Sequence, residues 1–375
     1  MWEDSLGFKY PFIDASSCVG CRACESACPA LDGGPGDEAL EVRWAKGKSA
    51  DVLEASSSGG IFGLLARDVL ADGGVVCGAA WADGCRRVEH VLVEDVASLD
   101  RVMRSKYVQS SVGRGVYEGV RDALRAGRRV LFAGTACQVA GLKRYLGRAG
   151  ENGLLLTVDV ICHGVPSPRL WAEWIDYKNR LRGSDVCDVN MRSKTAGWLS
   201  YSAMYEYIAE KDPSSSREFT VFDRDWYMKA FLTNASLRPS CFKCPAKRGC
   251  GSDITLGDFW GFQSIHPEVD YSKGISAVIC NTERGRAAFN GIRASVECGE
   301  ATLDEVLPGN PSLVRSVAPY RKRDEFMADV SSGAGIEALM AKYGFRPTLL
   351  QKVFGKLTLI AHSLAKPVKL VLGRI

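Results

Sequence analysis

The sequence predicts a mixed α/β fold, of α+β character in part, built from three units. These are a small cysteine-rich module, an α/β domain with a β-rich insertion, and a helical C-terminal tail. Segments typical of buried strands alternate with segments whose apolar residues recur at helical spacing, an order that favours a largely parallel sheet. The cysteine-rich stretch ends at a glycine-rich turn, residues 33–36, after which the pattern changes. We therefore expect units at residues 1–44, 45–310 and 311–375.

Four cysteines dominate the first module. Cys18, Cys21, Cys24 and Cys28, the last followed by Pro29, have the CxxCxxCxxxCP spacing of bacterial-type ferredoxin loops, which hold a [4Fe-4S] cluster. A structural zinc site or a disulfide pair is the alternative, but zinc ligands usually form two CxxC pairs separated by a longer insert. The spacing therefore predicts a ferredoxin-like 4Fe-4S module.

The number of clusters stays open at this point. In two-cluster ferredoxins the fourth cysteine of such a loop binds the other cluster, and this sequence contains no second copy of the motif. Residues 7–11 resemble the hairpin that precedes the second cluster loop of such proteins. Either Cys28 completes a local ligand set, or the half that would supply a partner thiolate is missing. With little core of its own, the module is expected to fold around its metal.

The α/β domain is expected to open with a helix after residue 56. Ser57 and Ser58 are placed to cap it, and its apolar stripe has helical spacing. That stripe consists of Ile61, Phe62, Leu64, Leu65, Val69 and Leu70. Further strands are expected at 74–81, 129–132 and 154–161, and further helices at 112–126, 138–146 and 171–182.

A β-rich insertion is expected next. Its predicted strands are 186–191, 201–209 and 218–222, with an exposed loop at 211–217 that contains proline and serines. One more strand, 274–281, and one more helix, 282–293, follow the insertion.

The tail beyond residue 338 is basic and contains no acidic residue. Apolar residues between its lysines and arginines predict an amphipathic helix, which we expect to pack on its own domain. A peripheral contact with an anionic membrane or a partner protein is the alternative. The basic positions are Lys342, Arg346, Lys352, Lys356, Lys366, Lys369 and Arg374.

The composition of the 375 residues is that of a soluble globular protein, with 46% hydrophobic and 25% charged residues. A net charge of +4 is too small to indicate nucleic-acid binding. The acidic start lacks the features of a signal peptide, so we expect the 14 cysteines to stay reduced in the cytoplasm. No apolar run approaches the roughly 20 residues that a membrane span requires.

Further cysteines give the α/β domain its chemistry. Cys137 follows a glycine–threonine turn, where a helix N-terminus would lower its pKa and favour a thiolate, which suits a metal ligand or a redox nucleophile. Cys162 ends a buried strand, the usual position of ligands in open α/β sheets. Cys241 and Cys244 form a CxxC pair, and Cys250 close behind them is ambiguous. Simple packing is expected for Cys77, Cys85, Cys187, Cys280 and Cys298.

Several motifs together resemble the family of coenzyme F420 hydrogenase/dehydrogenase beta subunits, over about residues 7 to 310. They are Ser57-Ser-Gly-Gly60, Ser105-Lys-Tyr-Val-Gln-Ser110, Gly134-Thr-Ala-Cys-Gln-Val-Ala-Gly-Leu142, Asp159-Val-Ile-Cys-His-Gly-Val-Pro-Ser-Pro168, Arg238-Pro-Ser-Cys241 and Ser252-Asp-Ile-Thr-Leu-Gly-Asp-Phe-Trp-Gly261. The pattern Arg192-Ser-Lys194 with Gly197-Trp198 also resembles the family. Ala136 stands where the family commonly has proline. Members carry FAD and at least one [4Fe-4S] cluster, often behind a ferredoxin module.

The resemblance implies roles for individual residues. Cys137, Cys162, Cys241 and Cys244 would hold the cluster of the α/β domain, since one cubane requires four thiolates. FAD would bind through backbone amides and a helix N-terminus, with Lys106 offsetting phosphate charge. The cofactor-binding candidates are Ser57, Ser58, Gly59, Gly60, Lys106, Tyr107, Gly134 and Thr135. The candidates for binding an anionic substrate or moving a proton are His163, Arg192 and Lys194.

Three functions follow from these observations. The first is an iron–sulfur flavoprotein oxidoreductase that passes electrons from a ferredoxin-like donor through 4Fe-4S clusters to FAD and a small-molecule substrate, with coenzyme F420 or a sugar-linked compound as candidates. The second is an electron-transfer subunit without its own substrate, which serves a partner oxidoreductase. The third is a zinc-stabilised binding protein without redox chemistry.

Overall fold

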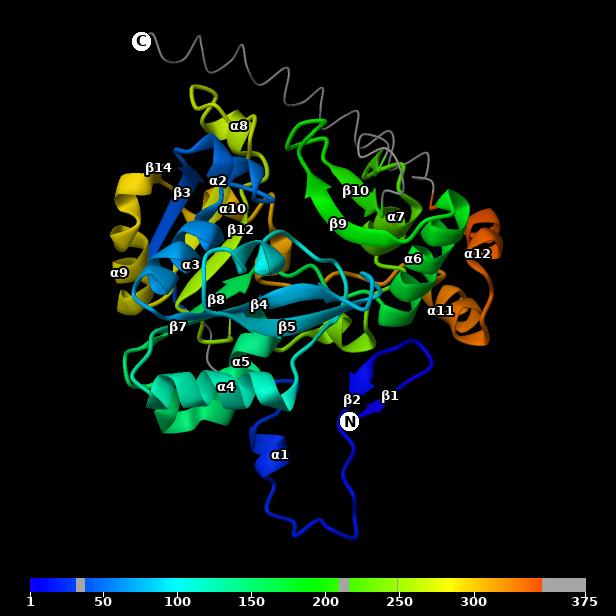
Figure 1. Ribbon diagram of the computed structural model, residues 1–375, viewed down its shortest axis with the longest axis horizontal. Coiled ribbons are helices and arrows are strands. Elements are labelled where there is room, and N and C mark those ends of the chain that lie inside the picture. Colours follow the sequence, from blue (N-terminus) through cyan, green and yellow to red (C-terminus); the bar gives the residue numbers. More distant parts are fainter. Residues whose placement is uncertain (32–37, 209–215, 248, 346–375) are drawn as a thin grey trace.

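A mixed nine-stranded sheet forms the centre of the computed structural model, which describes residues 1–31, 38–208, 216–247 and 249–345 (Figure 1). Within these residues the strand order is β14-β3-β13-β12-β8-β7-β4-β5-β6. The strands are β3 (Glu41–Gly47), β4 (Val75–Ala82), β5 (Arg87–Val93), β6 (Ser110–Ser111), β7 (Val130–Thr135), β8 (Leu155–Val160), β12 (Ile254–Asp258), β13 (Ser276–Cys280) and β14 (Val296–Glu300).

The expectation of a largely parallel sheet is correct only for the centre. Strands β12, β8, β7 and β4 are parallel neighbours, whereas β13, β3 and β14 pair antiparallel along one side and β5 pairs antiparallel with β4. Between β4 and β5 the turn has positive φ at Asp83, Gly84 and Cys85. So short a connection can only reverse the chain, because a parallel pair needs a long crossover.

Alternate residues of the central strands face different helices. Cys77 and Phe132 pack with α4 (Arg114–Arg125) and α5 (Ala136–Leu146). Val76 and Leu131 instead pack with α3 (Ile61–Ala71) and α9 (Glu283–Gly291) on the opposite face. Because successive side chains of a strand point to opposite faces, a sheet covered on both sides has strands that are apolar throughout. The predicted central strands and helices are confirmed.

The predicted β-rich insertion forms a separate sheet of order β11-β10-β9, from β9 (Val186–Ser193), β10 (Ser202–Tyr207) and β11 (Arg217–Val221). It packs with α6 (Pro168–Arg182), α7 (Trp226–Leu232), α11 (Arg323–Ser332) and α12 (Ile336–Lys342), at the right of Figure 1. Residues 311–345 thus contribute Phe326, Leu339 and Tyr343 to a core shared with the insertion. The helix predicted for the tail lies, beyond Phe345, outside the described residues, as do positions 211–215 of the predicted loop.

The N-terminal module is joined to the rest through its hairpin. Strands β1 (Trp2–Glu3) and β2 (Lys9–Tyr10) pair antiparallel, which confirms the predicted hairpin. Phe8 is fully buried in the core of the insertion, and the Leu6 carbonyl accepts bonds from Ser167 Oγ (2.6 Å) and the Arg169 amide (3.2 Å). The module therefore shares a core with the main body, and β3, which begins at Glu41, already belongs to the central sheet.

Smaller elements complete the described residues. They are α1 (Ala23–Ser26), α2 (Ala50–Glu54), α8 (Phe262–Ile265), α10 (Leu303–Val306) and five 3₁₀ turns at Leu99–Val102, Gly147–Gly150, Pro239–Lys243, Arg293–Ser295 and Pro311–Leu313. Across the residues that the structure describes, no helix combines the length and the apolar character needed to span a bilayer.

The expected serine cap of α3 is wrong. Its N-cap is Gly60, which has a φ of 84° and makes no side-chain capping bond. The Ser57 hydroxyl accepts a bond from the Ser105 amide (2.9 Å), and the Ser58 hydroxyl donates to the Ile275 carbonyl (2.9 Å). Both serines are therefore used to hold neighbouring segments together.

His90 makes the fold sensitive to acid. It is buried on β5, where Nε2 donates to the Ala133 carbonyl (3.0 Å) and Nδ1 is bonded to the Ser110 hydroxyl. Burial lowers the pKa of His90 from 6.5 to about 4. The unfolded chain therefore takes up a proton at a higher pH than the folded chain, and stability falls as pH drops from 6.5 toward 4.

We expect His90 to contribute about 3 kcal/mol to acid destabilisation at the lower end of this range, since each pKa unit corresponds to about 1.4 kcal/mol. Urea unfolding at a series of pH values measures this for the wild type and for His90→Gln, which keeps hydrogen-bonding groups but does not titrate. The variant should lose that part of the pH dependence. Identical pH profiles for the two proteins would contradict the assignment.

Candidate functional site

The carboxyl ends of β7 and β8 bring two cysteines to one edge of the sheet. β7 leads directly into α5, whose second residue is Cys137, and Cys162 lies two residues beyond β8. Thr135 caps α5 in a capping box with Gln138, and its hydroxyl lies 3.2 Å from Cys137 Sγ. Because β7 and β8 are parallel neighbours, the two thiols are held on the same side of the sheet.

A short antiparallel bridge brings the CxxC pair to this edge. Pro166 pairs with Leu237, and the Arg238 amide donates to the Val165 carbonyl (2.9 Å). The chain then enters the 3₁₀ helix η4 (Pro239–Lys243), which carries Cys241. Gly164 has a φ of 145°, and a Cβ there would lie 2.8 Å from Leu237 Cδ1 and 3.4 Å from Cys241 Cβ. This glycine permits the close approach of the two segments.

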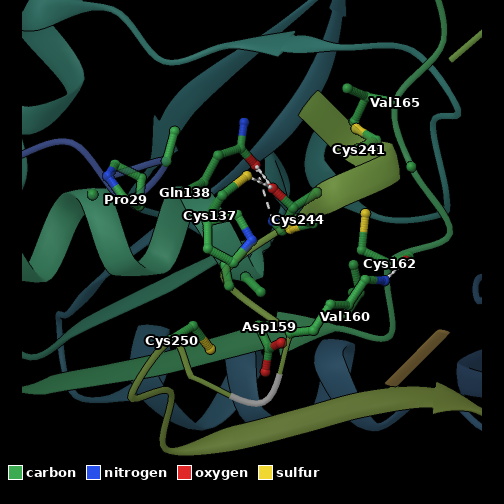
Figure 2. Close-up of a pocket in the computed structure, with 18 of the residues that line it drawn as sticks. Pro29, Cys137, Gln138, Asp159, Val160, Cys162, Val165, Cys241, Cys244 and Cys250 are labelled. Carbon is green, nitrogen blue, oxygen red and sulfur yellow. Dashed lines mark hydrogen bonds between the residues drawn. The ribbon is translucent and has the colours of Figure 1, made fainter. Parts of the chain in front are cut away.

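The four thiols line one cavity of about 490 Å³. In Figure 2 the sulfur atoms of Cys137, Cys162, Cys241 and Cys244 face a common space between α5, η4 and the end of β8. Cys250 also lines the cavity but is drawn apart from these four, nearer to Asp159. The structure thus brings together the four cysteines that the resemblance selects, together with the ambiguous Cys250.

Cys28 lines the same cavity, with Pro29 beside it. The Cys28 carbonyl accepts a bond from Arg144 Nη1 (2.7 Å) on α5, the helix that carries Cys137. Cys18, Cys21 and Cys24 are exposed, whereas Cys28 is half-buried. The fourth cysteine of the N-terminal run therefore differs from the first three in its surroundings, because it lies against the α/β domain.

The expected lowering of the Cys137 pKa is wrong. The side chain is reachable by solvent, but it lies within a cavity whose walls desolvate it, and this burial raises its pKa. Burial likewise raises the pKa of Cys162 to about 12 and that of Cys241 to about 11. Desolvation thus outweighs the helix N-terminus. These thiols favour the protonated form until a metal takes the place of the proton.

Cationic side chains surround the cavity. Lys247 donates to the carbonyls of Cys162 and Ser312, and it lines the cavity together with Lys9 and Arg238. A cluster with four thiolate ligands is anionic, so positive charge in these walls favours its binding. The site therefore fits an iron–sulfur cluster both in its thiol set and in its charge.

The four thiols stand around a shared volume. Among the described residues, no group of three or more Cys, His, Asp or Glu side chains is placed to hold a single metal ion. In a cubane each thiolate binds a different iron, so the ligands stand around a volume. Four sulfur atoms facing a cavity have this arrangement.

A second group of predicted residues gathers near the end of β12. The Tyr107 amide contacts Met191 Sδ (3.0 Å), next to Arg192, and the Ser105 amide binds Ser57 Oγ. Lys106 donates to the Met103 carbonyl (2.7 Å). Burial lowers the pKa of both Lys106 and Lys194 to about 8. The structure thus brings the loop 57–60, Lys106, Tyr107, Arg192 and Lys194 into one neighbourhood.

Arg192 is enclosed in this group. Its side chain is 2% exposed, and Nη2 donates to Asp258 Oδ1 (2.9 Å). Its guanidinium carbon lies 3.8 Å from the Tyr201 ring centroid and 4.9 Å from that of Trp260. Burial disfavours the charge, but the Asp258 carboxylate together with Tyr107 and Tyr201 outweighs this and raises the Arg192 pKa. The Nε atom is buried without a partner in the described residues.

Lys194 already uses all three of its donors. It donates to the carbonyls of Leu53, Ser58 (3.1 Å) and Lys273 (2.7 Å), so it joins α2, the loop 57–60 and the loop before β13. Gly59 is required here by packing, since its Cβ would lie 2.3 Å from the Ala45 carbonyl oxygen. The Gly59 amide donates to Ser276 Oγ (3.0 Å).

The remaining candidates lie at the cavity. Thr135 and His163 line it, and Gly134 directly precedes Thr135 on β7. His163 Nε2 is bonded to Asn234 Oδ1 (2.6 Å), and burial lowers the His163 pKa. Its ring packs edge-on against Phe231, which in turn stacks on Tyr107 at 4.6 Å. His163 thus stands between the two groups of predicted residues.

Sequence reasoning missed Arg144, Lys247 and Asp258 as parts of these sites. Asp258 lies in a quoted motif and at a strand end, a position that could have indicated it. No local sequence pattern indicates Arg144 or Lys247.

Of the five cysteines expected to be packed, Cys77, Cys85 and Cys280 are buried, Cys298 is half-buried, and Cys187 is exposed, so packing does not account for Cys187.

Removing the Asp258 carboxylate should strongly destabilise the protein. It accepts bonds from Arg192 and from Trp198 Nε1 (2.7 Å), so Asp258→Ala leaves a buried cation unpaired, at an expected cost of about 3–5 kcal/mol. Adding Arg192→Met should recover part of the loss. Urea unfolding measures the free energy of unfolding of both variants. The control is Glu118→Ala, which breaks a pair with the exposed Arg114 and should lower the free energy of unfolding by less than about 0.5 kcal/mol. Equal losses in Asp258→Ala and the control would refute this prediction.

Two family models match the chain. Residues 127–305 match the model of the C terminus of the coenzyme F420 hydrogenase/dehydrogenase beta subunit, and residues 9–30 match a 4Fe-4S binding domain. The first match contains Cys137, Cys162, Cys241 and Cys244, and the second contains the N-terminal cysteine run.

Known proteins give further similarities. The chain is 25% identical over 150 residues to the F subunit of F(420)H(2) dehydrogenase from Methanosarcina mazei, a stretch that covers 39% of this chain and 41% of that protein. The match thus spans less than half of the relative's length. A chain in a solved structure of the F420-reducing [NiFe] hydrogenase complex from Methanosarcina barkeri aligns with 79% of this chain and 91% of its own length, at 18% identity and a TM-score of 0.49. On the two model matches and the motifs that they enclose, the chain is similar to the coenzyme F420 hydrogenase/dehydrogenase beta subunits over residues 127–305 and to 4Fe-4S binding domains over residues 9–30.

Proposed function

We propose that this protein is an iron–sulfur flavoprotein oxidoreductase. It takes electrons from a ferredoxin-like donor and passes them through two 4Fe-4S clusters to FAD and on to a small-molecule substrate. The observation that carries the proposal is the cavity in which four thiols from three separate segments face one another, with Cys28 of the N-terminal run in the same wall.

In this proposal Cys137, Cys162, Cys241 and Cys244 hold the cluster of the cavity, and the N-terminal run holds the other. The capping box of Thr135 and Gln138 fixes the start of α5 and thereby the position of Cys137. Lys247 holds the carbonyl of Cys162 in the cavity wall, and its charge favours an anionic occupant.

The second group of residues fits FAD in charge and in donor supply. Lys106 and Arg192 are cations in a poorly solvated environment, and Arg192 Nε is a buried donor without a partner in the described residues. In the proposal these residues, Tyr107 and the loop 57–60 hold the cofactor, while Lys194 positions that loop from behind. A bound flavin supplies the conversion between one-electron and two-electron transfer. The roles of Gly134 and Thr135 at a flavin stay predictions, since both lie at the cysteine cavity.

The substrate is proposed only as a class, an anionic small molecule. Coenzyme F420 is one candidate, because the matched relative is named as part of an F(420)H(2) dehydrogenase. A sugar-linked compound is another. His163, which lines the cysteine cavity, remains the proposed contact for substrate or proton, whereas the enclosed Arg192 is assigned to the flavin group. All fourteen cysteines are free, which fits the reducing cytoplasm as the proposed location.

An electron-transfer subunit is the second candidate function. The relative from Methanosarcina mazei is named as one subunit of F(420)H(2) dehydrogenase, and it supports the proposal that this chain serves a partner oxidoreductase. In that case the same two clusters and FAD would be present, and the reducible substrate would lie on the partner.

Iron content tests the cluster assignment. Anaerobically purified wild type should contain about eight iron and eight sulfide per chain, and both Cys241→Ser and Cys21→Ser should lose about four of each. Cys187→Ser, at an exposed cysteine outside both sites, is the matched control and should keep all of them. Zinc without sulfide or flavin would overturn the proposal in favour of a zinc-stabilised protein.

Flavin reoxidation separates the two redox functions. The isolated chain is reduced with a low-potential donor, and the optical spectrum of its flavin is followed after addition of oxidised F420 or a candidate sugar-linked compound. Reoxidation by one of these without a partner is expected for the reductase. Reoxidation only in the presence of a partner protein would favour the electron-transfer function.

A further inference from the structure

Arg238 lies between the N-terminal module and the cysteine cavity. It precedes η4 and lines the cavity beside Cys241 and Cys244. Its side chain reaches across to β2 of the N-terminal hairpin. Arg238 is the first residue of the motif Arg238-Pro-Ser-Cys241, but the family resemblance implies no role for it.

On the side of the hairpin, Arg238 makes contacts of two kinds. Nη2 donates to the Lys9 carbonyl (3.0 Å), and the guanidinium carbon lies 4.3 Å from the ring centroid of Tyr10 and 5.7 Å from that of Phe8. A planar guanidinium can stack on rings and donate in its plane at the same time, which a lysine cannot do. These contacts hold the strand that leads into the cysteine run.

On the side of the cavity, the backbone of Arg238 helps to build the site. Its amide donates to the Val165 carbonyl, and its carbonyl accepts from the Cys241 amide (3.0 Å). Arg238 is therefore fixed in place by the same short bridge that brings Cys241 toward Cys162. The hairpin and the cluster ligands are attached to one residue.

The charge of Arg238 is not neutralised. Its side-chain partners in the described part of the chain are the Lys9 carbonyl, the Gln109 amide oxygen (3.1 Å) and the Ser240 hydroxyl (3.2 Å), all of them uncharged. An arginine without a carboxylate at the wall of a poorly solvated cavity favours extra negative charge inside it. Reduction of a cluster adds such charge, so positive charge nearby raises its reduction potential.

We propose that Arg238 is a positioning residue that couples the two iron–sulfur sites, by docking the N-terminal module on the cavity and by raising the reduction potential of the cluster held there. The second part rests on the proposed function. The first part concerns the protein alone and does not depend on any cofactor. Electron transfer between the sites would be favoured by both effects, since docking fixes their separation and the charge makes the cavity the better acceptor.

Three variants test this in the full chain. Arg238→Met removes the charge and the hydrogen bonds, whereas Arg238→Lys keeps a positive charge without the planar fork. Arg323→Met is the matched control, because Arg323 donates to the carbonyl of the neighbouring Leu237 (2.7 Å) and is paired with Asp324. Arg323 does not line the cavity.

Hydrogen exchange measures docking, with or without clusters. Amides of residues 2–10 should exchange about tenfold faster in both Arg238 variants, as expected for losing a hydrogen bond from a charged group. They should stay near the wild-type rate in Arg323→Met. Unchanged exchange in Arg238→Met, or an equal increase in Arg323→Met, would overturn the docking role.

A redox titration followed by electron paramagnetic resonance measures the reduction potential of the cavity cluster. The signal of this cluster is identified as the one that is lost in Cys241→Ser. Its midpoint should shift to more negative potential in Arg238→Met and stay near wild type in Arg238→Lys and Arg323→Met. No shift in Arg238→Met, or an equal shift in Arg323→Met, would overturn the electrostatic role. If the wild type has no such signal, the proposed function fails, and with it the electrostatic role, while the exchange experiment still decides the docking role.

Discussion

The pairing of residues 165–166 with 237–238 is the interaction on which the site depends. One bridge and two flanking hydrogen bonds join the segment after β8 to the segment before η4. Without it Cys162 would remain at a strand end, and Cys241 and Cys244 would lie on a separate turn. Gly164 makes the pairing possible, because a side chain there would collide with Leu237. The same bridge fixes Arg238, and through it the N-terminal hairpin. The cavity, its ligands and its neighbouring module thus depend on a few main-chain bonds.

Much of the fold could be predicted from local pattern, and the exceptions have a physical cause. Strands β7 and β8 and helices α4, α5 and α6 are apolar runs or stripes that are evident in the sequence. The antiparallel pairing of β3 with β13 and β14 joins residues about 230 and 250 positions apart, so no local pattern specifies it. β12 is another exception, because it is short and lies within a motif that was interpreted for its function and not as a strand. The expected serine cap failed because both serines bind distant segments.

The sequence predicts those parts of the candidate site in which the order of strands and helices alone decides where a residue lies. Cys137 and Cys162 follow parallel neighbouring strands, so their nearness follows from the order of elements. Arg192 and Asp258, in contrast, are 66 residues apart and meet only because the insertion folds back over the end of β12. Arg192 was expected to face substrate, yet it is enclosed by aromatic rings and a carboxylate. The Cys137 pKa was misjudged because a helix terminus is visible in the sequence and the desolvating walls of a cavity are not.

The burial of Phe8 has a consequence for how the chain is made. This residue belongs to the core that α6, α7 and α11 share, and the Leu6 carbonyl is held by Ser167 and Arg169. During synthesis the cysteine run therefore leaves the ribosome long before the surface that receives its hairpin exists. Delivery of iron and sulfide to the first module can thus precede its docking, because Ser167, Arg169 and Arg238, which hold its hairpin, are synthesised long after the cysteine run.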